Sequence, residues 1–586
     1  MIDYDSIRNL PSMFFDRAQR RGDETFLASK PGETWQTLSW RAVGEQVSAL
    51  SRGLRDLGVG AGDRVVIVSE NRPEWFIADL AIMCAGATSV PAYTTNTPDD
   101  HFHILSDSGA KLAIVSTTAL AERLIPAVQR SPETNTLIAM EASVSDAQGA
   151  HIVTWEDTLD AGRALPDDVA EKVHAINRKD TSCIIYTSGT GGRPKGVVLS
   201  HGAILCNCRG AYDLLRGLPD FAEDGERFLS FLPLSHSYEH TAGLHFAMSI
   251  GAEIYYAQSI DRLVGNMAET APTIMTAVPR LYETIHGRII SGVTQAGGLK
   301  EKLFMKAVAL GTQRYENPDS LSFLQRLLDG LLDKLVRAKV ADRFGGRLKA
   351  FVSGGAPLNP EIGTFFLALG VRILQGYGQT ESAPVISCNP VNGIRIHTVG
   401  PALTGVTVKI AGDGEILVQG ELLMDGYWNN PKATAEVLVD GWLHTGDIGV
   451  IDDDGYIQIT DRKKDIIVNT GGDNLSPQRV EGMLTLEPEI GQAMVFGDRR
   501  PHLVALLVPD EEWANTANGD EEIRAKLSDA VDRVNKKLSM IERIRRFTVA
   551  KEPFTTDNEM MTPSMKIRRH VITAKYGDAL KSLYGG

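Results

Sequence analysis

Residues 186–197 read YTSGTGGRPKGV, and this stretch decides how the rest of the chain is interpreted. The β-branched run before it predicts a strand that ends at Tyr186. The ten residues 187–196 then contain four glycines, three hydroxyl side chains and Lys195. Glycines let backbone N–H groups crowd around an anion, hydroxyls donate further hydrogen bonds, and a lysine adds positive charge. The stretch therefore predicts a phosphate-binding loop after a strand.

This loop differs from the Walker A type of phosphate loop. The pattern GxxxxGK[ST] places a hydroxyl residue after its lysine, whereas Lys195 is followed by Gly196. A flexible hairpin with incidental hydroxyls is the plain alternative. The candidate phosphate contacts are Thr187, Ser188, Gly189, Thr190, Gly192 and Lys195.

The loop resembles that of the adenylate-forming (AMP-binding) superfamily, TSGTTGxPKG, with Gly191 in place of the usual second threonine. One hydroxyl donor is lost by this change, while the backbone donors remain. Five further segments match motifs of that family in the same order: SGGAPL (353–358), QGYGQTES (375–382), WLHTGDIG (442–449), DRKKDIIVNTGG (461–472) and DNEMMTPSMKIRR (557–569). The resemblance covers roughly residues 14–575.

The resemblance implies roles in binding the nucleotide. Thr380 would touch the α-phosphate, and Glu381 would hold a magnesium ion, with Thr187 as a second ligand, against the triphosphate oxygens. Asp447 would accept hydrogen bonds from the ribose hydroxyls, with Arg462 as a further ribose contact. The expected adenine pocket consists of Gly354, Gly355, Ala356, Gln375, Tyr377 and Gly378.

The C-terminal motifs imply a mobile lid. Lys464 matches the pivot of the family's hinge, and Gly471 matches the glycine that lines the pantetheine tunnel of coenzyme A. Lys566 occupies the position of the catalytic lysine, whose ammonium group stabilises the negative charge that gathers when a carboxylate attacks the α-phosphorus. Met565 stands where the family often has glycine, a variant that resembles the long-chain fatty acyl subgroup.

Other segments resemble long-chain acyl-CoA synthetases. They are residues 71–98 and the insertion of roughly 60 residues at 285–345, which members with shorter substrates generally lack. In LPLSHSYEHTAG (232–243), where the family places the entrance to its acyl site, His236 would lie near the carboxylate and Tyr238 is a candidate gate. Ordinary packing of both side chains is the alternative.

Composition and charge describe a large globular chain of several domains. Its 586 residues include 60 Lys or Arg and 74 Asp or Glu, a formal net charge of −14, and 43% are hydrophobic. Short β-branched runs alternate with helical patterns, which predicts an α/β fold with parallel sheets. Gly- and Asp-rich turns separate short strands over 399–460, which predicts a small antiparallel sheet or β-barrel.

The charge distribution predicts a boundary near Asp461. Residues 462–586 hold 20 basic and 19 acidic side chains, whereas the preceding part is strongly acidic. We therefore expect a large N-terminal AMP-binding body over 1–461, built of two αβ-layered sheets and the β-barrel-like part. A smaller α+β C-terminal lid follows over 462–586.

The same features exclude several classes of protein. An acidic surplus argues against nucleic-acid binding, and five scattered cysteines suit a reduced cytoplasmic protein. We find no secretory signal and no transmembrane segment. Fatty substrates partition into membranes, so peripheral membrane contact is an alternative location, although the acidic body shows no basic amphipathic helix that would favour it. Residues 321–344 predict a helix that packs on the body through Leu321, Leu324, Leu328, Leu331, Leu335 and Val336. A membrane-surface or oligomer face, for example in a homodimer, is the alternative.

Taken together, the motifs predict an ATP-dependent ligase with Mg²⁺ as cofactor and ATP and coenzyme A as co-substrates. A long-chain fatty acid would first form an acyl-adenylate, and its acyl group would then pass to coenzyme A. Lys566, Thr380, Glu381 and His236 are the candidate catalytic residues. One alternative is an adenylating enzyme for another carboxylic acid or for loading a carrier protein. A second is a non-catalytic nucleotide binder, to which only Gly191 points.

Overall fold

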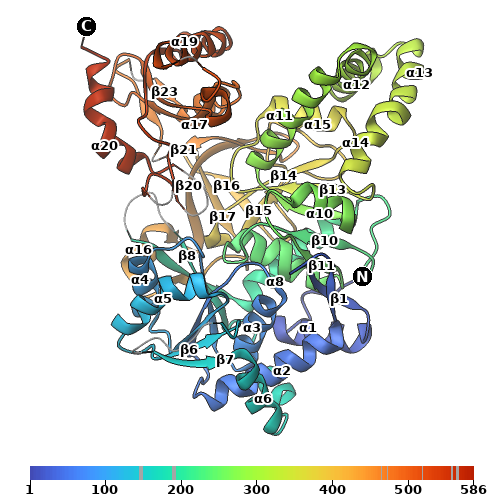
Figure 1. Cartoon of the computed structure of the whole chain (residues 1–586), viewed down its shortest axis with the longest axis vertical. Helices are drawn as coiled ribbons and strands as arrows, with labels where there is room; N and C mark the ends of the chain where they lie inside the picture. The colour runs from blue at the N-terminus through green and yellow to red at the C-terminus, as the bar shows by residue number, and fades with distance from the viewer. Residues whose placement is uncertain are drawn as a thin grey trace.

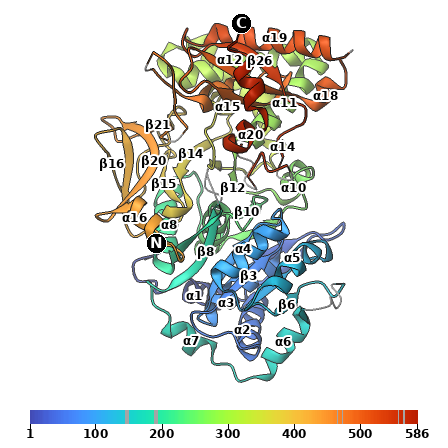
Figure 2. The ribbon, with the colours of Figure 1, turned by 90° about the vertical axis from the view of Figure 1, so that its left-hand side faces the viewer.

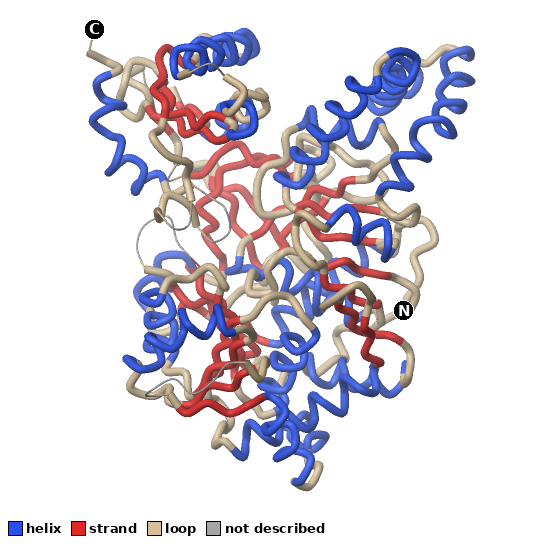
Figure 3. The backbone as a smooth tube through the Cα atoms, in the orientation of Figure 1, coloured by secondary structure: helices blue, strands red, loops and turns tan. Residues whose placement is uncertain are grey.

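The computed structural model describes residues 1–143, 150–187, 193–463, 465–471, 473–517, 519–555, 558–562 and 567–585. Two eight-stranded sheets, a five-stranded sheet and a smaller C-terminal unit make up the described chain (Figure 1). Helices cover the strands of both large sheets (Figure 3). The predicted α/β class, with a large N-terminal body and a smaller C-terminal unit, is confirmed.

One large sheet carries the predicted phosphate loop. Its order is β18-β9-β8-β4-β3-β5-β6-β7, parallel from β8 to β7 and antiparallel at β8–β9 and β9–β18. Its strands are β3 (Arg64–Val68), β4 (Thr88–Ala92), β5 (Leu112–Val115), β6 (Thr136–Ala139), β7 (His151–Thr154), β8 (Thr181–Thr187), β9 (Lys195–Ser200) and β18 (Gly426–Tyr427). The helices of this part are α3 (Pro73–Cys84), α4 (Pro98–Ser108), α5 (Thr118–Arg130), α6 (Trp155–Ala164) and α7 (Val169–Ala175).

The other large sheet carries the two glycine-rich adenine motifs. Its order is β15-β14-β13-β12-β10-β11-β1-β2, parallel inside and antiparallel at both edges. Its strands are β1 (Thr25–Ser29), β2 (Gln36–Ser39), β10 (Arg227–Ser230), β11 (Glu253–Tyr256), β12 (Ile274–Ala277), β13 (Ala350–Ser353), β14 (Ile373–Gly378) and β15 (Val385–Cys388). Both motifs begin at the carboxyl ends of parallel strands, where ligands bind in open α/β sheets.

The core between the sheets is built from apolar helices and stacked aromatic rings. Helix α3, PEWFIADLAIMC, is buried along nearly its whole length, as expected of a helix that is apolar on all sides. Phe26 and Trp40 stack with ring centroids 3.6 Å apart. Helices α1 (Leu10–Arg21), α2 (Trp40–Asp56) and α8 (His201–Leu215) contribute to the same apolar cluster.

A π-helix, Glu239–His245, follows the predicted acyl entrance and continues into α9 (Phe246–Ser249). Nε2 of His240 lies 3.1 Å from Oδ2 of Asp79, and both side chains are fully buried. Burial lowers the pKa of His240, but the charge of Asp79 outweighs it and raises that pKa to about 10. Burial also raises the pKa of Glu239 to about 7, while Thr276 donates a hydrogen bond to its carboxylate. Buried polar contacts thus fix this π-helix.

The antiparallel unit predicted over 399–460 is a five-stranded sheet of order β16-β17-β20-β19, with β21 also paired to β20. Its elements are β16 (Thr407–Ile410), β17 (Glu415–Gln419), α16 (Pro431–Val437), β19 (Leu438–Val439), β20 (Trp442–Ile451) and β21 (Ile457–Arg462). Strand β20 meets β21 with Asp447 opposite Arg462. The register therefore places both predicted ribose contacts side by side.

Helices of the 285–345 insertion project from the body (Figure 1). The insertion contains most of α11 (Pro279–Ala296), and α12 (Gly298–Glu316), α13 (Phe323–Leu332), a π-helix (Asp333–Arg337) and α14 (Ala338–Arg343). Helix α10 (Leu263–Thr270) precedes it, and α15 (Pro360–Ala368) lies beside α12. The predicted helix is confirmed, but its predicted buried stripe is partly wrong. Leu324, Leu331 and Leu335 are exposed, and Leu332 is buried. The helix has apolar residues on two faces, and packing on α12 buries only one.

The C-terminal unit has its own apolar cores. Its elements are β22 (Ile467–Val468), β23 (Asn474–Leu475), α17 (Pro477–Leu484), β24 (Ile490–Phe496), β25 (Leu503–Pro509), α18 (Glu511–Ala514), α19 (Asp520–Lys537), β26 (Ile544–Val549) and α20 (Arg569–Ser582). Figure 2 shows this unit at the same end of the body as the projecting helices. Among the described residues, no helix combines the length and the apolar character needed to cross a membrane.

Candidate active site

The ends of the predicted phosphate loop lie on two paired strands. Thr187 ends β8, Lys195 begins β9, and the two residues are opposite each other. The hydroxyl of Tyr186 donates a 2.7 Å hydrogen bond to Oδ2 of Asp107 and fixes the end of β8. The other predicted contacts of this loop, Ser188, Gly189, Thr190 and Gly192, lie outside the described residues, as does Gly191.

The acidic motif follows β14 in a tight turn. Thr380 and Glu381 stand in a 3₁₀-helix, Thr380–Ser382. Gly378 is required just before it, because an added Cβ would lie 1.8 Å from the carbonyl oxygen of Pro384. The hydroxyls of Thr380 and Ser237 are 3.0 Å apart, so the turn meets the loop that carries His236.

Tyr427 joins the acidic motif to the phosphate loop. Its hydroxyl donates a 2.7 Å hydrogen bond to Oε1 of Glu381, and Nζ of Lys195 lies 4.1 Å from the centroid of its ring. Burial raises the pKa of Tyr427, so the hydroxyl keeps its proton. One neutral side chain thus positions a carboxylate and a cation, as a site for phosphates and a metal ion requires.

The predicted ribose contacts are brought together at the edge of the five-stranded sheet. Nε of Arg462 lies 3.1 Å from Oδ1 of Asp447. The hydroxyl of Tyr377 donates a 2.6 Å hydrogen bond to Oδ2 of the same carboxylate. Asp447 is 4% exposed, so its orientation is fixed by both neighbours. The Asp447 carboxylate is thus an oriented hydrogen-bond acceptor beside the ring of Tyr377.

The predicted adenine segment lies against the predicted acyl entrance. Gly355 has a φ of +84°, which glycine adopts without strain. A Cβ on Gly354 would lie 3.2 Å from the ring of Tyr238, whose hydroxyl donates to the carbonyl of Val352. Nδ1 of His236 lies 3.2 Å from the amide nitrogen of Tyr238. The loops after β10 and β13 therefore form one wall.

Gln375 contributes an unsatisfied acceptor to this wall. Its side chain is buried, and its Oε1 has no hydrogen-bond partner among the described residues. Such an atom is costly unless a ligand or water satisfies it. Ala356, also predicted here, is exposed in the turn after β13.

A small apolar cavity begins one residue beyond the Ser237–Thr380 contact, at Tyr238. It lies among α8, the Glu239–His245 π-helix and strands of the second sheet. Its lining is Ala211, Leu214, Leu215, Phe228, Tyr238, Ala242, Phe246, Ile274, Thr276, Val352, Val385, Cys388 and Leu403. A site with polar and charged side chains and an apolar cavity are therefore neighbours.

The C-terminal unit meets the body at the phosphate hairpin. Met561 and Arg568 line one pocket together with Tyr186, Pro194 and residues that follow β4. Lys566 and Lys464 both lie outside the described residues. The described neighbours of Lys566 nevertheless stand at the ends of the phosphate loop.

The predicted hinge starts directly after the ribose contact Arg462. Burial raises the pKa of Asp461 to about 6. Gly471 is exposed in the turn between β22 and β23. An added Cβ there would meet Asn469 and Asp473 of the same turn. Gly471 therefore belongs to the C-terminal unit, in the turn between β22 and β23.

Two contact residues escaped the sequence analysis. Tyr427 lies in ELLMDGYWNNPKAT (421–434), outside the phosphate loop and the five motifs that follow it. Ser237 lies between His236 and Tyr238 but carried no signal of its own. Only the pairing of β18 with β9 and the approach of the two loops reveal their contacts.

Comparison with known proteins identifies the family to which the chain belongs. A model described as "AMP-binding enzyme" matches residues 14–428, and one described as "AMP-binding enzyme C-terminal domain" matches residues 464–586. The chain belongs to the AMP-binding enzyme family. Within this family, it is 33% identical to the long-chain-fatty-acid–CoA ligase FadD15 of Mycobacterium bovis over 98% of this chain and 97% of the relative. It is 31% identical to long chain acyl-CoA synthetase 6, peroxisomal, of Arabidopsis thaliana, over 94% and 82%.

Solved structures of AMP-binding enzymes share the fold at lower identity. The A-PCP didomain of carboxylic acid reductase from Segniliparus rugosus, in complex with AMP, matches with a TM-score of 0.80 and 21% identity over 99% of this chain and 82% of the other. An anthranilate CoA ligase in complex with anthranoyl-AMP matches with a TM-score of 0.73 and 20% identity over 99% and 100%. At this identity the likeness supports the fold of the AMP-binding enzyme alone.

Proposed function

We propose that this AMP-binding enzyme is a long-chain fatty acid–CoA ligase, which forms an acyl-adenylate from ATP and then transfers the acyl group to coenzyme A. The observation that carries the proposal is the apolar cavity at Tyr238, which adjoins the polar contacts of Thr380, Glu381 and Lys195. A fatty acid needs this combination, because its tail is apolar and its carboxylate must meet a phosphate. The printed names of the relatives at 31–33% identity agree with it.

The nucleotide is proposed to bind along the line from Asp447 to Lys195. Asp447 would exchange its present donors for the ribose hydroxyls, with Arg462 and Tyr377 alongside. Gln375 offers its unsatisfied oxygen to an N–H donor of the base. Lys195 and the backbone of the loop would hold the β- and γ-phosphates.

The first reaction is proposed to occur at Thr380. A carboxylate oxygen of the fatty acid attacks the α-phosphorus, the bond to the bridging oxygen breaks, and pyrophosphate leaves. The Thr380 hydroxyl would donate to an α-phosphate oxygen, His236 would orient the carboxylate, and Lys566 would stabilise the negative charge of the transition state. In the second reaction the thiolate sulfur of coenzyme A attacks the acyl carbonyl, and AMP leaves.

A magnesium ion fits the donors at this place. Glu381 presents a carboxylate of which Oε1 accepts from Tyr427, and Thr187 presents a hydroxyl at the end of β8. Oxygen donors of this kind are those that Mg²⁺ prefers. When bound, the ion would neutralise charge on the triphosphate and make pyrophosphate a better leaving group.

The two reactions are proposed to share one site through rotation of the C-terminal lid, residues 462–586, against the body, residues 1–461. Lys464 would be the pivot. Lys566 would close on the body for the first reaction, and Gly471 would line the path of coenzyme A in the second. The pocket between Met561, Arg568 and the phosphate hairpin supports a lid that reaches the site.

Filling the cavity tests the assignment of the acyl chain. Ala211 lines the cavity from α8, and we propose that a long tail extends past it, so that Ala211→Phe would block the tail. We expect kcat/KM for palmitate to fall about tenfold or more, while octanoate is affected little, because the lost contacts amount to roughly 1–3 kcal/mol per methylene. Pyrophosphate release measured across acids from acetate to oleate gives both values.

The matched control is Ala119→Phe, which adds the same ring to an exposed position near the start of α5. It should leave the chain-length profile unchanged. An equal loss for short and long acids in Ala211→Phe would contradict the placement of the tail. Absence of pyrophosphate release by the unaltered protein with every acid would contradict the ligase itself.

A further inference from the structure

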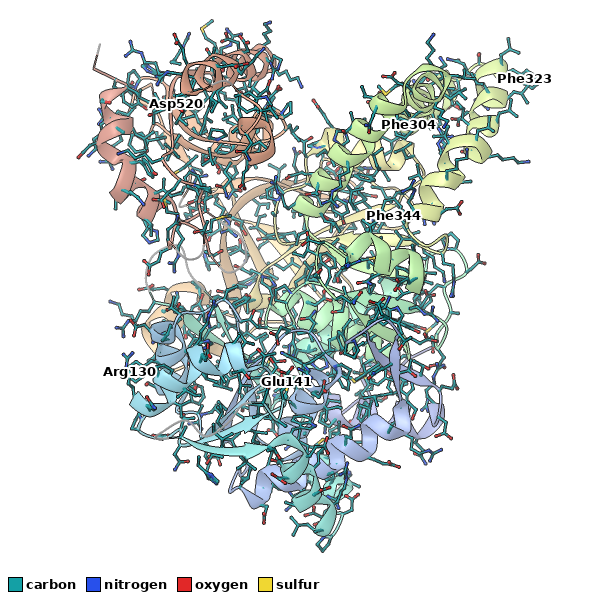
Figure 4. All side chains as sticks on the ribbon, in the orientation of Figure 1. Arg130, Glu141, Phe304, Phe323, Phe344 and Asp520 are labelled. Carbon is teal, nitrogen blue, oxygen red and sulfur yellow. The ribbon has the colours of Figure 1, made fainter. Side chains whose placement is uncertain are left out.

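The helices of the insertion carry an exposed apolar ridge. We define the arm as residues 298–343, that is α12, α13, the Asp333–Arg337 π-helix and α14. Figure 4 shows Phe323 at the outer end of the arm, away from the body. The ridge consists of Phe323, Leu324, Leu327, Leu331 and Leu335, which are 80%, 76%, 60%, 53% and 52% exposed. Large apolar side chains gathered in this way mark an interaction surface.

The ridge lies on regular helix, along α13 and the π-helix that follows it. Leu324, Leu327 and Leu331 are spaced by three and four residues, so they share one face of α13. The opposite face is packed, because Leu332 and Val336 belong to an apolar cluster with residues of α12 and α15. Packing inside the chain therefore leaves the ridge uncovered and holds it in place.

The charge of the arm is opposite to that of the whole chain. Residues 298–343 contain nine Lys or Arg and six Asp or Glu, whereas the full chain has a net charge of −14. Two of the acids are neutralised within the arm, since Arg337 binds Asp329 and Asp333, and Arg314 also binds Asp329. The exposed lysines of the arm are Lys300, Lys302, Lys306, Lys334 and Lys339. Uncompensated positive charge therefore lies beside the ridge. This corrects the expectation that the chain has no basic amphipathic helix, because the acidic total of −14 concealed a local basic surplus.

We propose that the arm docks on an anionic phospholipid surface, with the ridge in the interfacial region and the lysines on the lipid headgroups. An amphipathic helix with one apolar face and lysines beside it binds such a surface through both interactions. A second copy of the chain is a poorer occupant, because each copy would bring the same surplus of positive charge to the contact. A ridge one helix wide is also narrow for a dimer interface of about 800 Å² per partner. The proposal does not depend on the ligase assignment.

Vesicle binding tests this proposal directly. The full chain is sedimented with vesicles of phosphatidylcholine and phosphatidylglycerol in equal parts, and with vesicles of phosphatidylcholine alone. We expect binding to the anionic vesicles that weakens as salt is raised, and weak binding to the neutral ones. The variant L324Q/L327Q/L331Q should bind the anionic vesicles about tenfold or more weakly, since three inserted side chains are lost.

Two further variants separate the docking surface from general effects. Lys334→Glu with Lys339→Glu keeps the ridge and should also lower binding to anionic vesicles, whereas Met540→Gln removes a side chain of the lid that is 72% exposed and should not. Melting temperatures check that each variant is folded. The proposal is overturned if the unaltered chain sediments with neither kind of vesicle, or if the ridge variant binds the anionic vesicles as well as the unaltered chain does. It is also overturned if, without lipid, the unaltered chain sediments as a dimer that the ridge variant loses.

Discussion

At the scale of single residues, the candidate site depends on side chains that orient one another. Asp447 is held by Tyr377 on one oxygen and Arg462 on the other, and Glu381 is held by Tyr427. Charge-assisted hydrogen bonds of this kind are short and directional, so each carboxylate has a fixed orientation before any ligand binds. A ligand that replaces one donor meets an acceptor already in position.

Asp447→Ala should therefore weaken nucleotide binding more than it weakens the fold. Losing hydrogen bonds to a charged acceptor costs about 1.5–3 kcal/mol, and we expect KM for ATP to rise roughly tenfold to a hundredfold. Initial rates at varied ATP concentration give the value. Asp453→Ala, in the exposed turn after β20, is the matched control and should leave KM unchanged. An unaltered KM in Asp447→Ala would remove Asp447 from the ribose site.

At the scale of elements, a π-helix that begins with the buried acid Glu239 follows the predicted acyl entrance. Glu239 follows Tyr238 directly, and its carboxylate is fully buried beside Thr276. Its pKa is raised by burial from 4.5 to about 7, so the folded state binds this proton more tightly than the unfolded state. The stability that results is present below pH 4.5 and is lost as the pH rises toward 7.

Glu239→Gln should remove this pH dependence. Relative to the unaltered chain, the variant should gain roughly 1–3 kcal/mol in free energy of unfolding between pH 4.5 and pH 8. Glutamine keeps an acceptor for the Thr276 hydroxyl but carries no charge. Urea unfolding at both pH values measures the difference. If the gap between the two proteins is the same at both, Glu239 does not titrate in this range.

The sequence predicted the motifs well but not their contacts. Strand ends and glycine turns locate Thr187, Glu381 and Asp447, because their chemistry lies in short patterns. The contact of Tyr427 with Glu381 depends on the pairing of β18 with β9, which joins residues more than two hundred positions apart. The buried face of α13 was also mispredicted, because apolar periodicity does not say which of two apolar faces the neighbouring helices cover.

At the scale of the whole molecule, the body and the lid meet where the chemistry is proposed. Lid residues Met561 and Arg568 share a pocket with Tyr186 and Pro194 of the phosphate hairpin. A domain that approaches the site for one reaction and leaves it for the next can supply a lysine only when it is needed. The proposed hinge at Lys464 separates these two parts.

Lys566→Ala should separate the two half-reactions. Removing one group that stabilises transition-state charge lowers rates by about 10²–10³, so acyl-adenylate formation should fall by this factor. Thioester formation from chemically prepared acyl-adenylate and coenzyme A should remain close to normal. Both rates are measured by rapid quench. Equal losses in the two reactions would contradict the movement of the lid.

The central claim is that this AMP-binding enzyme joins long-chain fatty acids to coenzyme A, and one competition measures it most directly. The protein is incubated with ATP, Mg²⁺, coenzyme A and an equimolar mixture of acids from acetate to oleate, and the thioesters are identified by mass spectrometry. We expect acyl-CoA products of about twelve carbons or more to dominate, because a long tail would bury more apolar surface along the acyl path proposed to begin at Tyr238. AMP should form in equal amount. Products from short or aromatic acids, or AMP formation without any thioester, would contradict the account.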